Sequence, residues 1–119
     1  MKQINIINAY NALGSLADNK NFSSKDQWLI YKLHKELRSH FEFQQEQEAN
    51  INNKYLPMAD ENGQITGEVY QNYVKEIFEL KNMEVDMDFE KINLPFVDGL
   101  SFKDIEPLED FINFKPTED

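Results

Sequence analysis

Cysteine is absent from the 119-residue sequence, which excludes a disulfide framework, a thiolate zinc site and a cysteine nucleophile. Glycine and proline are scarce, with four residues of each, and no glycine-rich phosphate loop or low-complexity linker occurs. No stretch approaches the roughly 20 apolar residues that a membrane span requires. Residues 1–8 lack both a long apolar run and a small-residue cleavage site, so we expect no signal peptide and an intracellular protein.

Basic residues are few, and the net charge is −10. Residues 1–54 hold seven Lys/Arg and six Asp/Glu, whereas residues 55–119 hold five Lys/Arg and sixteen Asp/Glu. The acidic excess therefore lies wholly in the second half. Such a surface repels phosphate, which argues against direct nucleic-acid binding, and it can attract a basic partner or simply maintain solubility.

The length fits one domain, residues 1–119, that buries roughly two thirds of its unfolded surface without a covalent or metal staple. Nine Phe, five Tyr and one Trp supply large apolar side chains for its core. Both helical and alternating patterns occur along the chain. The fold class we predict is α+β and mostly helical.

Helical periodicity dominates residues 3–53 and predicts an antiparallel helical hairpin. We expect Leu13 and Leu16 of its first helix to share one core with Leu33 and Leu37 of its second. The second helix has two possible capping boxes at its start, Ser24 with Gln27 or Ser23 with Asp26.

The middle of the second helix, Glu42 to Asn50, is almost wholly polar. A helix that is polar all round is usually solvated or waits for a partner. We therefore expect this part to be exposed and to project from the domain, where it would contact a partner protein. The candidate partner-binding residues are Gln44, Gln47, Glu48 and Ile51.

Residues 55–67 contain Asn62-Gly63, a strong turn signal that here predicts a short β-hairpin. The same residues resemble the middle of a calcium loop, with Asp60 and Asn62 as ligands. Met58 and Val69 would then occupy the first and last ligand positions, where carboxylates are needed. We expect a turn and no tight calcium site.

The apolar periodicity of residues 68–81 predicts a third helix with one apolar face. Residues 95–119 form the C-terminal segment. Ser101 with Asp104 opens a helical turn there, and Leu108 and the residues after it should return to the core. We also expect Ile77, Phe78, Val85 and Phe89 to join that core. The apolar face of the third helix comprises Tyr70, Tyr73, Val74, Ile77 and Phe78.

Residues 83–94 alternate between apolar and acidic side chains, which predicts a strand with a bulge near Glu90-Lys91 and an end at Pro95. Two interpretations of the acidic face are open. The row could imitate a nucleic-acid backbone, or it could guard an edge strand against aggregation. The residues of this possible partner-binding face are Glu84, Asp86, Asp88 and Glu90.

Catalytic and metal-binding patterns are not apparent. His34 and His40 are six residues apart and so lie on different helix faces, with no third histidine beside them. Gly14-Ser15 lies inside a predicted helix and lacks the strand–turn–helix context of a nucleophile elbow. We therefore expect no enzyme, no cofactor and no metal.

The order of segments resembles a family of short phage and prophage proteins of unknown function. The likeness rests on the opening helix around Asn8 to Leu16, Lys54-Tyr55 followed by Asp60 to Gly63, and the acidic alternation from Glu84 to Phe89. It extends to the closing Leu108 to Ile112. The resemblance implies a phage or prophage accessory or assembly protein that works by protein–protein contact, in the bacterial cytoplasm or on a virion. The alternative is an acidic inhibitor that mimics nucleic acid and blocks a host defence protein. The oligomeric state and the partner's identity stay open.

Overall fold

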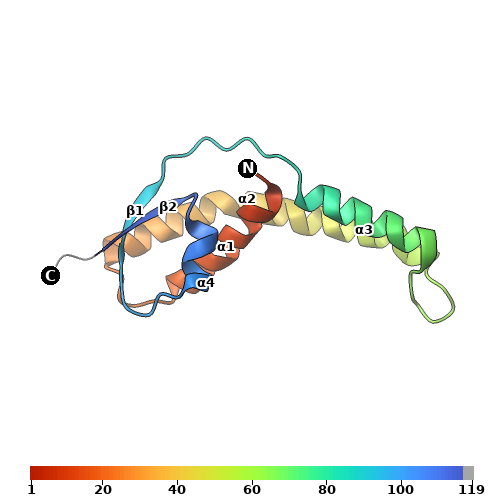
Figure 1. Cartoon of the computed structure of the whole chain (residues 1–119), viewed down its shortest axis with the longest axis horizontal. Helices are drawn as coiled ribbons and strands as arrows, with labels where there is room; N and C mark the ends of the chain where they lie inside the picture. The colour runs from red at the N-terminus through yellow and green to blue at the C-terminus, as the bar shows by residue number, and fades with distance from the viewer. Residues whose placement is uncertain (117–119) are drawn as a thin grey trace.

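The computed structural model describes residues 1–116 and shows a mostly helical α+β protein of elongated shape (Figure 1). Its extents are 63 × 29 × 19 Å and its radius of gyration is 18.2 Å, against about 13–14 Å for a compact domain of this length. The molecule therefore has a globular body and a long arm. In chain order the elements are α1 (Gln3–Ala17), α2 (Ser24–Tyr55), the 3-10 turn η1 (Leu56–Met58), α3 (Gly67–Lys81), β1 (Ile92–Phe96), α4 (Phe102–Ile105), the 3-10 turn η2 (Glu106–Leu108) and β2 (Ile112–Pro116).

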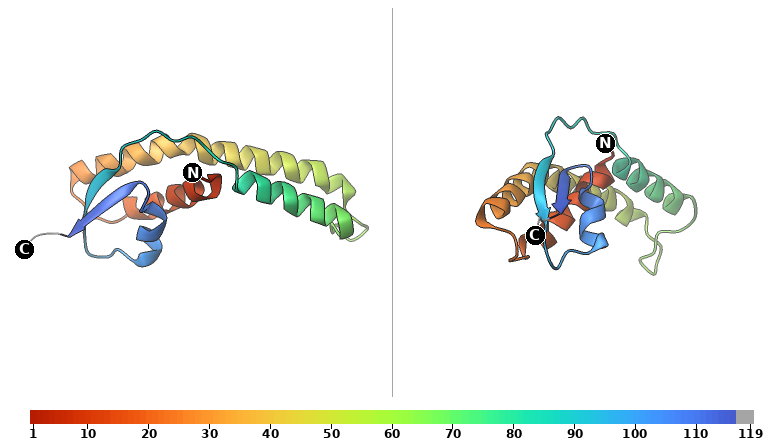
Figure 2. Two further views of the ribbon diagram at one scale, coloured as in Figure 1. Left: turned by 45° about the horizontal axis from the view of Figure 1, so that its top comes forward. Right: turned by 60° about the vertical axis from the view of Figure 1, so that its left-hand side comes forward.

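The predicted antiparallel hairpin is confirmed by α1 and α2, which pack along each other in the body (Figures 1 and 2). Helix α2 begins in the second of the two possible registers, because the Ser23 side chain accepts a hydrogen bond of 3.1 Å from the backbone N–H of Asp26. All four predicted core leucines of the two helices are buried: Leu13, Leu16, Leu33 and Leu37.

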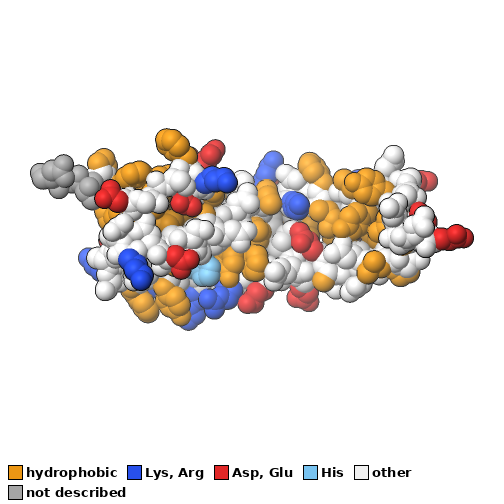
Figure 3. Space-filling model, turned by 90° about the horizontal axis from the view of Figure 1, so that it is seen from below, with side chains coloured by type: hydrophobic (Ala, Val, Ile, Leu, Met, Phe, Trp, Pro, Cys, Tyr) orange, Lys and Arg blue, Asp and Glu red, His pale blue; other side chains and the backbone are white. Residues whose placement is uncertain are grey.

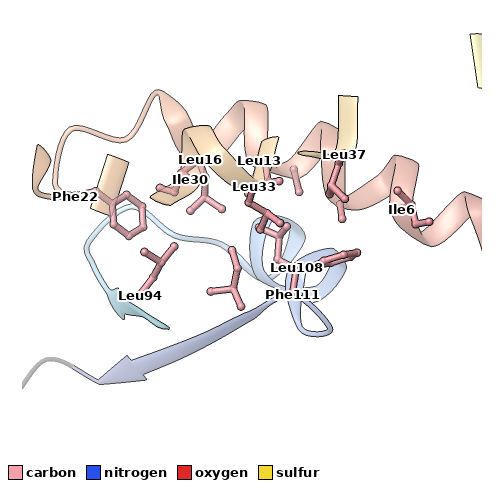
Figure 4. Close-up of a cluster of buried hydrophobic side chains, with 13 residues drawn as sticks. Ile6, Leu13, Leu16, Phe22, Ile30, Leu33, Leu37, Leu94, Leu108 and Phe111 are labelled. Atoms are coloured by element: carbon pink, nitrogen blue, oxygen red, sulfur yellow. The ribbon is translucent and has the colours of Figure 1, made fainter. Parts of the chain in front are cut away.

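The C-terminal residues close the core of the body (Figure 4). Leu108 and Phe111 are buried against α1 and α2, as the sequence predicts, and the helical turn α4 has the expected Ser101–Asp104 capping box. Strand β2 then pairs with β1 in parallel, with Ile92 opposite Ile112. The pairing carries β1 through Pro95, so the predicted strand end at this proline is wrong. Residues 117–119 of the predicted segment 95–119 lie outside the described residues.

Helix α3 has the predicted range but not the predicted packing. It runs beside the C-terminal half of α2, and together they form the arm (Figure 2). Ile77 is half-buried there, and Phe78 is 64% exposed. The prediction that Ile77 and Phe78 join the core is wrong. The body core is formed by α1, α2 and the C-terminal residues, and α3 packs mainly on α2 in the arm and touches only the start of α1.

The predicted strand over residues 83–94 is also largely wrong. Strand β1 begins only at Ile92, and the residues before it form one isolated antiparallel bridge, between Lys2 and Glu84. The predicted alternation nevertheless holds, since Val85, Met87 and Phe89 pack against the core while the acidic side chains between them are exposed. The segment is extended and crosses from the arm to β1 (Figure 1).

The connection between α2 and α3 is a loop and not the predicted β-hairpin. The Asp60 side chain accepts hydrogen bonds of 2.9 Å from the backbone N–H groups of Asn62 and Gln64, which closes the turn. Gly63 has φ 75°, a backbone angle that glycine adopts at little cost. These local bonds satisfy the loop without any paired strand. None of the helices within residues 1–116 has the length and hydropathy needed to cross a membrane.

Candidate protein-interaction surface

The arm is held together by three contacts between α2 and α3. The ring of Tyr55, only 5% exposed, packs edge-on against Tyr73 with 5.6 Å between ring centroids. The Tyr73 hydroxyl donates a hydrogen bond of 2.6 Å to Asn52 Oδ1. Lys54 Nζ forms an ion pair of 2.8 Å with Glu76 Oε1. Each of these contacts joins one residue of α2 to one residue of α3, so together they fix α3 against α2.

We expect the ion pair to make the arm sensitive to acid. The hydrogen bond from Lys54 lowers the pKa of Glu76 from its usual value of 4.5, and the same bond raises the pKa of Lys54. A carboxylate whose pKa is lowered by folding stabilises the folded state above its unfolded pKa. That stabilisation is lost as the pH falls below 4.5 and through the lower folded value.

We therefore expect the melting temperature of the Glu76→Gln variant to fall less between neutral pH and about pH 3 than that of the wild type. Circular dichroism at each pH measures the difference. Glu79→Gln is the matched control, because Glu79 is also on α3 but has no ion-pair partner among the described residues. If both variants follow the same pH curve, the Lys54–Glu76 pair does not stabilise the arm.

One face of α3 is apolar and uncovered. Tyr70, Val74 and Phe78 are 52%, 43% and 64% exposed, and they are spaced four residues apart, so they line one stripe. The described chain buries no residue of α3 fully. We call these three residues the α3 stripe. Hydrophobic side chains are visible along the arm on the face shown in Figure 3.

The tip of the arm extends this apolar surface. Leu56 and Met58 of η1 are 60% and 53% exposed. A shallow hollow of about 530 Å³ lies between the loop and α3, lined by Leu56, Ile65, Tyr70 and Tyr73 among others. Large apolar side chains grouped on one surface are typical of protein–protein contact sites.

The candidate residues on α2 are not exposed as predicted. Gln44 is 4% exposed, and Gln47, Glu48 and Ile51 are half-buried. The start of α1 and the end of α3 meet over this part of α2 (Figure 1), and Gln44 Nε2 donates to Glu48 Oε1 at 2.8 Å. The expectation that Gln44 is exposed is therefore wrong. Its amide nitrogen is satisfied by Glu48, whereas its Oε1 is buried without a hydrogen-bond partner among the described residues. The uncovered face of the arm lies on α3.

Sequence reasoning placed Phe78 of the α3 stripe in the core and so did not identify the stripe as a surface. The available signal was the width of the apolar face, which spans five large residues from Tyr70 to Phe78. A single neighbouring helix covers only part of such a wide face. Tyr73 and Ile77 take the covered side, and the stripe is left on the other.

The four acidic candidates are all exposed, and the extended chain places them in one row. Glu84, Asp86, Asp88 and Glu90 alternate with the residues that pack on the core. Glu84 is already engaged, since its Oε2 lies 3.1 Å from the N-terminal ammonium group. The three others face solvent without an ion-pair partner among the described residues.

The histidines have structural surroundings. His34 stacks on Tyr10 with 4.1 Å between ring centroids, and Tyr10 stacks in turn on Phe41. Burial, and then the nearby Arg38, lower the pKa of His34. His40 offers its backbone carbonyl to Gln3 Nε2 at 2.9 Å. Within residues 1–116, no group of three or more His, Asp or Glu side chains is placed to hold a metal ion.

Comparison of the chain with protein-family models, with curated proteins and with solved structures gave no match. The argument for function therefore rests on the two surfaces described above.

Proposed function

We propose that this protein is not an enzyme and acts by protein–protein contact through its arm. The observation that carries the proposal is the α3 stripe. Tyr70, Val74 and Phe78 are exposed there, on a helix in which no residue is fully buried by the described chain. An arm held by specific contacts at Tyr55, Tyr73 and Glu76 presents this stripe on a rigid support. Such preorganisation lowers the entropy cost of binding.

The partner that fits the stripe is an amphipathic helix. Anchors at positions i, i+4 and i+8 of α3 match the spacing of a helix packed alongside, as in helical bundles and helix-in-groove complexes. A partner helix laid on α3 would give the arm a third layer. The partner can be another protein or a second copy of this chain.

The setting in which this contact operates is proposed from sequence. The resemblance to short phage and prophage proteins supports an accessory or assembly role in an infected or lysogenic bacterial cell, or on the virion. A protein that recruits or joins other components through an exposed arm fits that role.

The alternative function, a nucleic-acid mimic that inhibits a host defence protein, would use the acidic row. Its support is the exposure of Asp86, Asp88 and Glu90 along one extended segment. Two features count against it. Glu84 is paired with the N-terminal ammonium group, and Lys32 and Lys35 line the groove beside Asp88 and Glu90, where a mimic needs uninterrupted negative charge.

The arm hypothesis predicts that a triple variant, Tyr70→Gln with Val74→Gln and Phe78→Gln, loses partner binding but not stability. Because about half of the surface of these residues is already exposed to water, the free energy of unfolding should change by no more than about 1 kcal/mol in total. Cross-linking and affinity purification from the host, with light scattering for self-association, measure binding. Urea unfolding measures stability.

Phe102→Gln is the matched control, because Phe102 is 88% exposed but lies on α4 in the body. It should keep every partner that the wild type binds. Two results contradict the proposal. One is a triple variant that binds every partner as the wild type does, and the other is a loss of several kcal/mol in stability, which would make the stripe part of the fold.

A further inference from the structure

The chain between Asp86 and Lys91 is extended, with side chains that alternate between the core and solvent, and it pairs with no strand among the described residues. Its ends are anchored, since Val85 N–H donates to Met1 O at 2.8 Å and Ile92 N–H donates to Phe111 O at 3.1 Å. Between these anchors, no hydrogen bond from the described residues reaches a backbone N–H or C=O group. A strand edge in this state offers a row of donors and acceptors to another extended chain.

A trough runs beside this segment, between it and α2. Its wider part, about 820 Å³, is lined by Trp28, Lys32 and Lys35 on the α2 side and by Asp88 and Glu90 on the other. A narrower part of about 170 Å³ continues to His40 and Asp86. The two parts share Leu33, Glu36, Asp88 and Phe89, so they lie next to each other along α2 and together make up the trough.

The length of the trough suits a short extended peptide. From Trp28 to His40, α2 rises about 18 Å at 1.5 Å per residue. An extended peptide of five or six residues spans about the same distance at roughly 3.3 Å per residue. The trough therefore accommodates one added strand beside residues 86–91.

The side chains of the trough specify the occupant. The floor is apolar, with Leu33 and Phe89, and the rim carries the stacked pair Trp28 and Tyr31, which are 58% and 47% exposed. Aromatic side chains of this kind are frequent binding anchors. An added strand would point every second side chain towards this apolar surface.

The opposite face of the added strand would lie beside the acidic row. Cross-strand neighbours are about 4.5–5.5 Å apart, at which distance opposite charges stabilise a pair and like charges destabilise it. A second copy of the segment would place carboxylates beside Asp86, Asp88 and Glu90. The row therefore disfavours self-pairing and favours a strand with lysine or arginine at alternate positions, provided that these side chains point to the acidic row and away from Lys32 and Lys35 on the α2 wall.

We propose that the trough between α2 and residues 86–92 is a β-augmentation site for an extended peptide of another protein, in which basic and apolar residues alternate. The peptide backbone pairs with the free edge of residues 86–91. Its apolar side chains meet Trp28, Leu33 and Phe89, and its basic side chains meet Asp86, Asp88 and Glu90. Peptide recognition by strand addition uses this combination of backbone bonds and alternate side-chain pockets. This site is separate from the α3 stripe and would give the protein two contact surfaces.

A synthetic eight-residue peptide that alternates lysine with valine or phenylalanine tests the proposal on the full chain. Trp28 is the only tryptophan, so its fluorescence reports binding at the trough directly. We expect saturable binding, and amide hydrogen exchange should slow at alternate residues between Asp86 and Lys91. A peptide of the same sequence, N-methylated on the residues that would pair, should bind at least about tenfold more weakly, because its backbone cannot donate.

Substitutions at exposed positions locate the site. Asp88→Lys combined with Glu90→Lys, and separately Trp28→Ala, should each weaken binding about tenfold or more, measured by calorimetry. Phe102→Ala, another exposed aromatic substitution but on α4, should leave it unchanged. Three results overturn the proposal: no binding at millimolar peptide, equal binding of the N-methylated peptide, or binding without protection of residues 86–91. The last two would indicate charge attraction alone.

Discussion

Replacing Phe111 by alanine should lower the free energy of unfolding by about 3–5 kcal/mol, the largest effect we expect from one substitution. Phe111 is 1% exposed, and its ring stacks on Phe89 with 4.7 Å between centroids. Its carbonyl also accepts the hydrogen bond from Ile92 that begins the β1–β2 pair. Removing the ring leaves a cavity where the C-terminal residues, the extended segment, α1 and α2 meet.

Urea unfolding followed by circular dichroism measures this loss, and Phe102→Ala is its control. Phe102 is 88% exposed, so the same substitution there should change the free energy of unfolding by less than about 0.5 kcal/mol. If Phe111→Ala costs less than about 1 kcal/mol, the C-terminal residues do not close the core as described.

Substituting proline for Ala49 should cost about 3 kcal/mol and release the arm. Ala49 is exposed within α2, so the change disturbs no packing. Proline removes the backbone N–H that bonds one turn back and places its ring against that carbonyl. The contacts that fix α3, at Asn52, Lys54 and Tyr55, all lie on the part of α2 that follows, so the arm should open while the α1–α2 body stays folded.

Amide hydrogen exchange distinguishes these regions. A cost of about 3 kcal/mol should make exchange in the arm about 100-fold faster, with little change in α1. Ser24→Pro is the matched control. Ser24 is the first residue of α2, where proline fits, and Ser23 before it is already extended at φ −64° and ψ 164°. Equal effects of the two prolines, or a uniform increase over the whole chain, would show that the arm does not open on its own.

The helices could be predicted from sequence because their signals are local. Leu13 and Leu16 are three residues apart and Leu33 and Leu37 are four apart, which shows the apolar face of each helix. Hydrogen bonds within each helix satisfy the backbone of that helix. Caps are local as well, as at Ser23 and at Ser101. The alternation after Met83 correctly separated the inward side chains from the acidic ones.

Strand pairing could not be predicted in the same way. A strand needs hydrogen bonds from a distant segment, and the alternating pattern does not say which segment supplies them. Ile92 pairs with Ile112 in β2, whereas the residues from Asp86 to Lys91 have no pairing strand among the described residues. The alternation was therefore consistent with a paired strand and with an unpaired one.

The sequence by itself determined the helices, their apolar faces, the caps and the exposed acidic row, because each depends on neighbours within a few residues. Only the tertiary structure decided what covers each face. It buried Gln44 on α2, left Phe78 exposed on α3, and formed the trough beside Asp88. Burial depends on which distant segments pack against a surface, and in this chain α1 and the C-terminal residues cover the core while α3 packs along α2 in the arm.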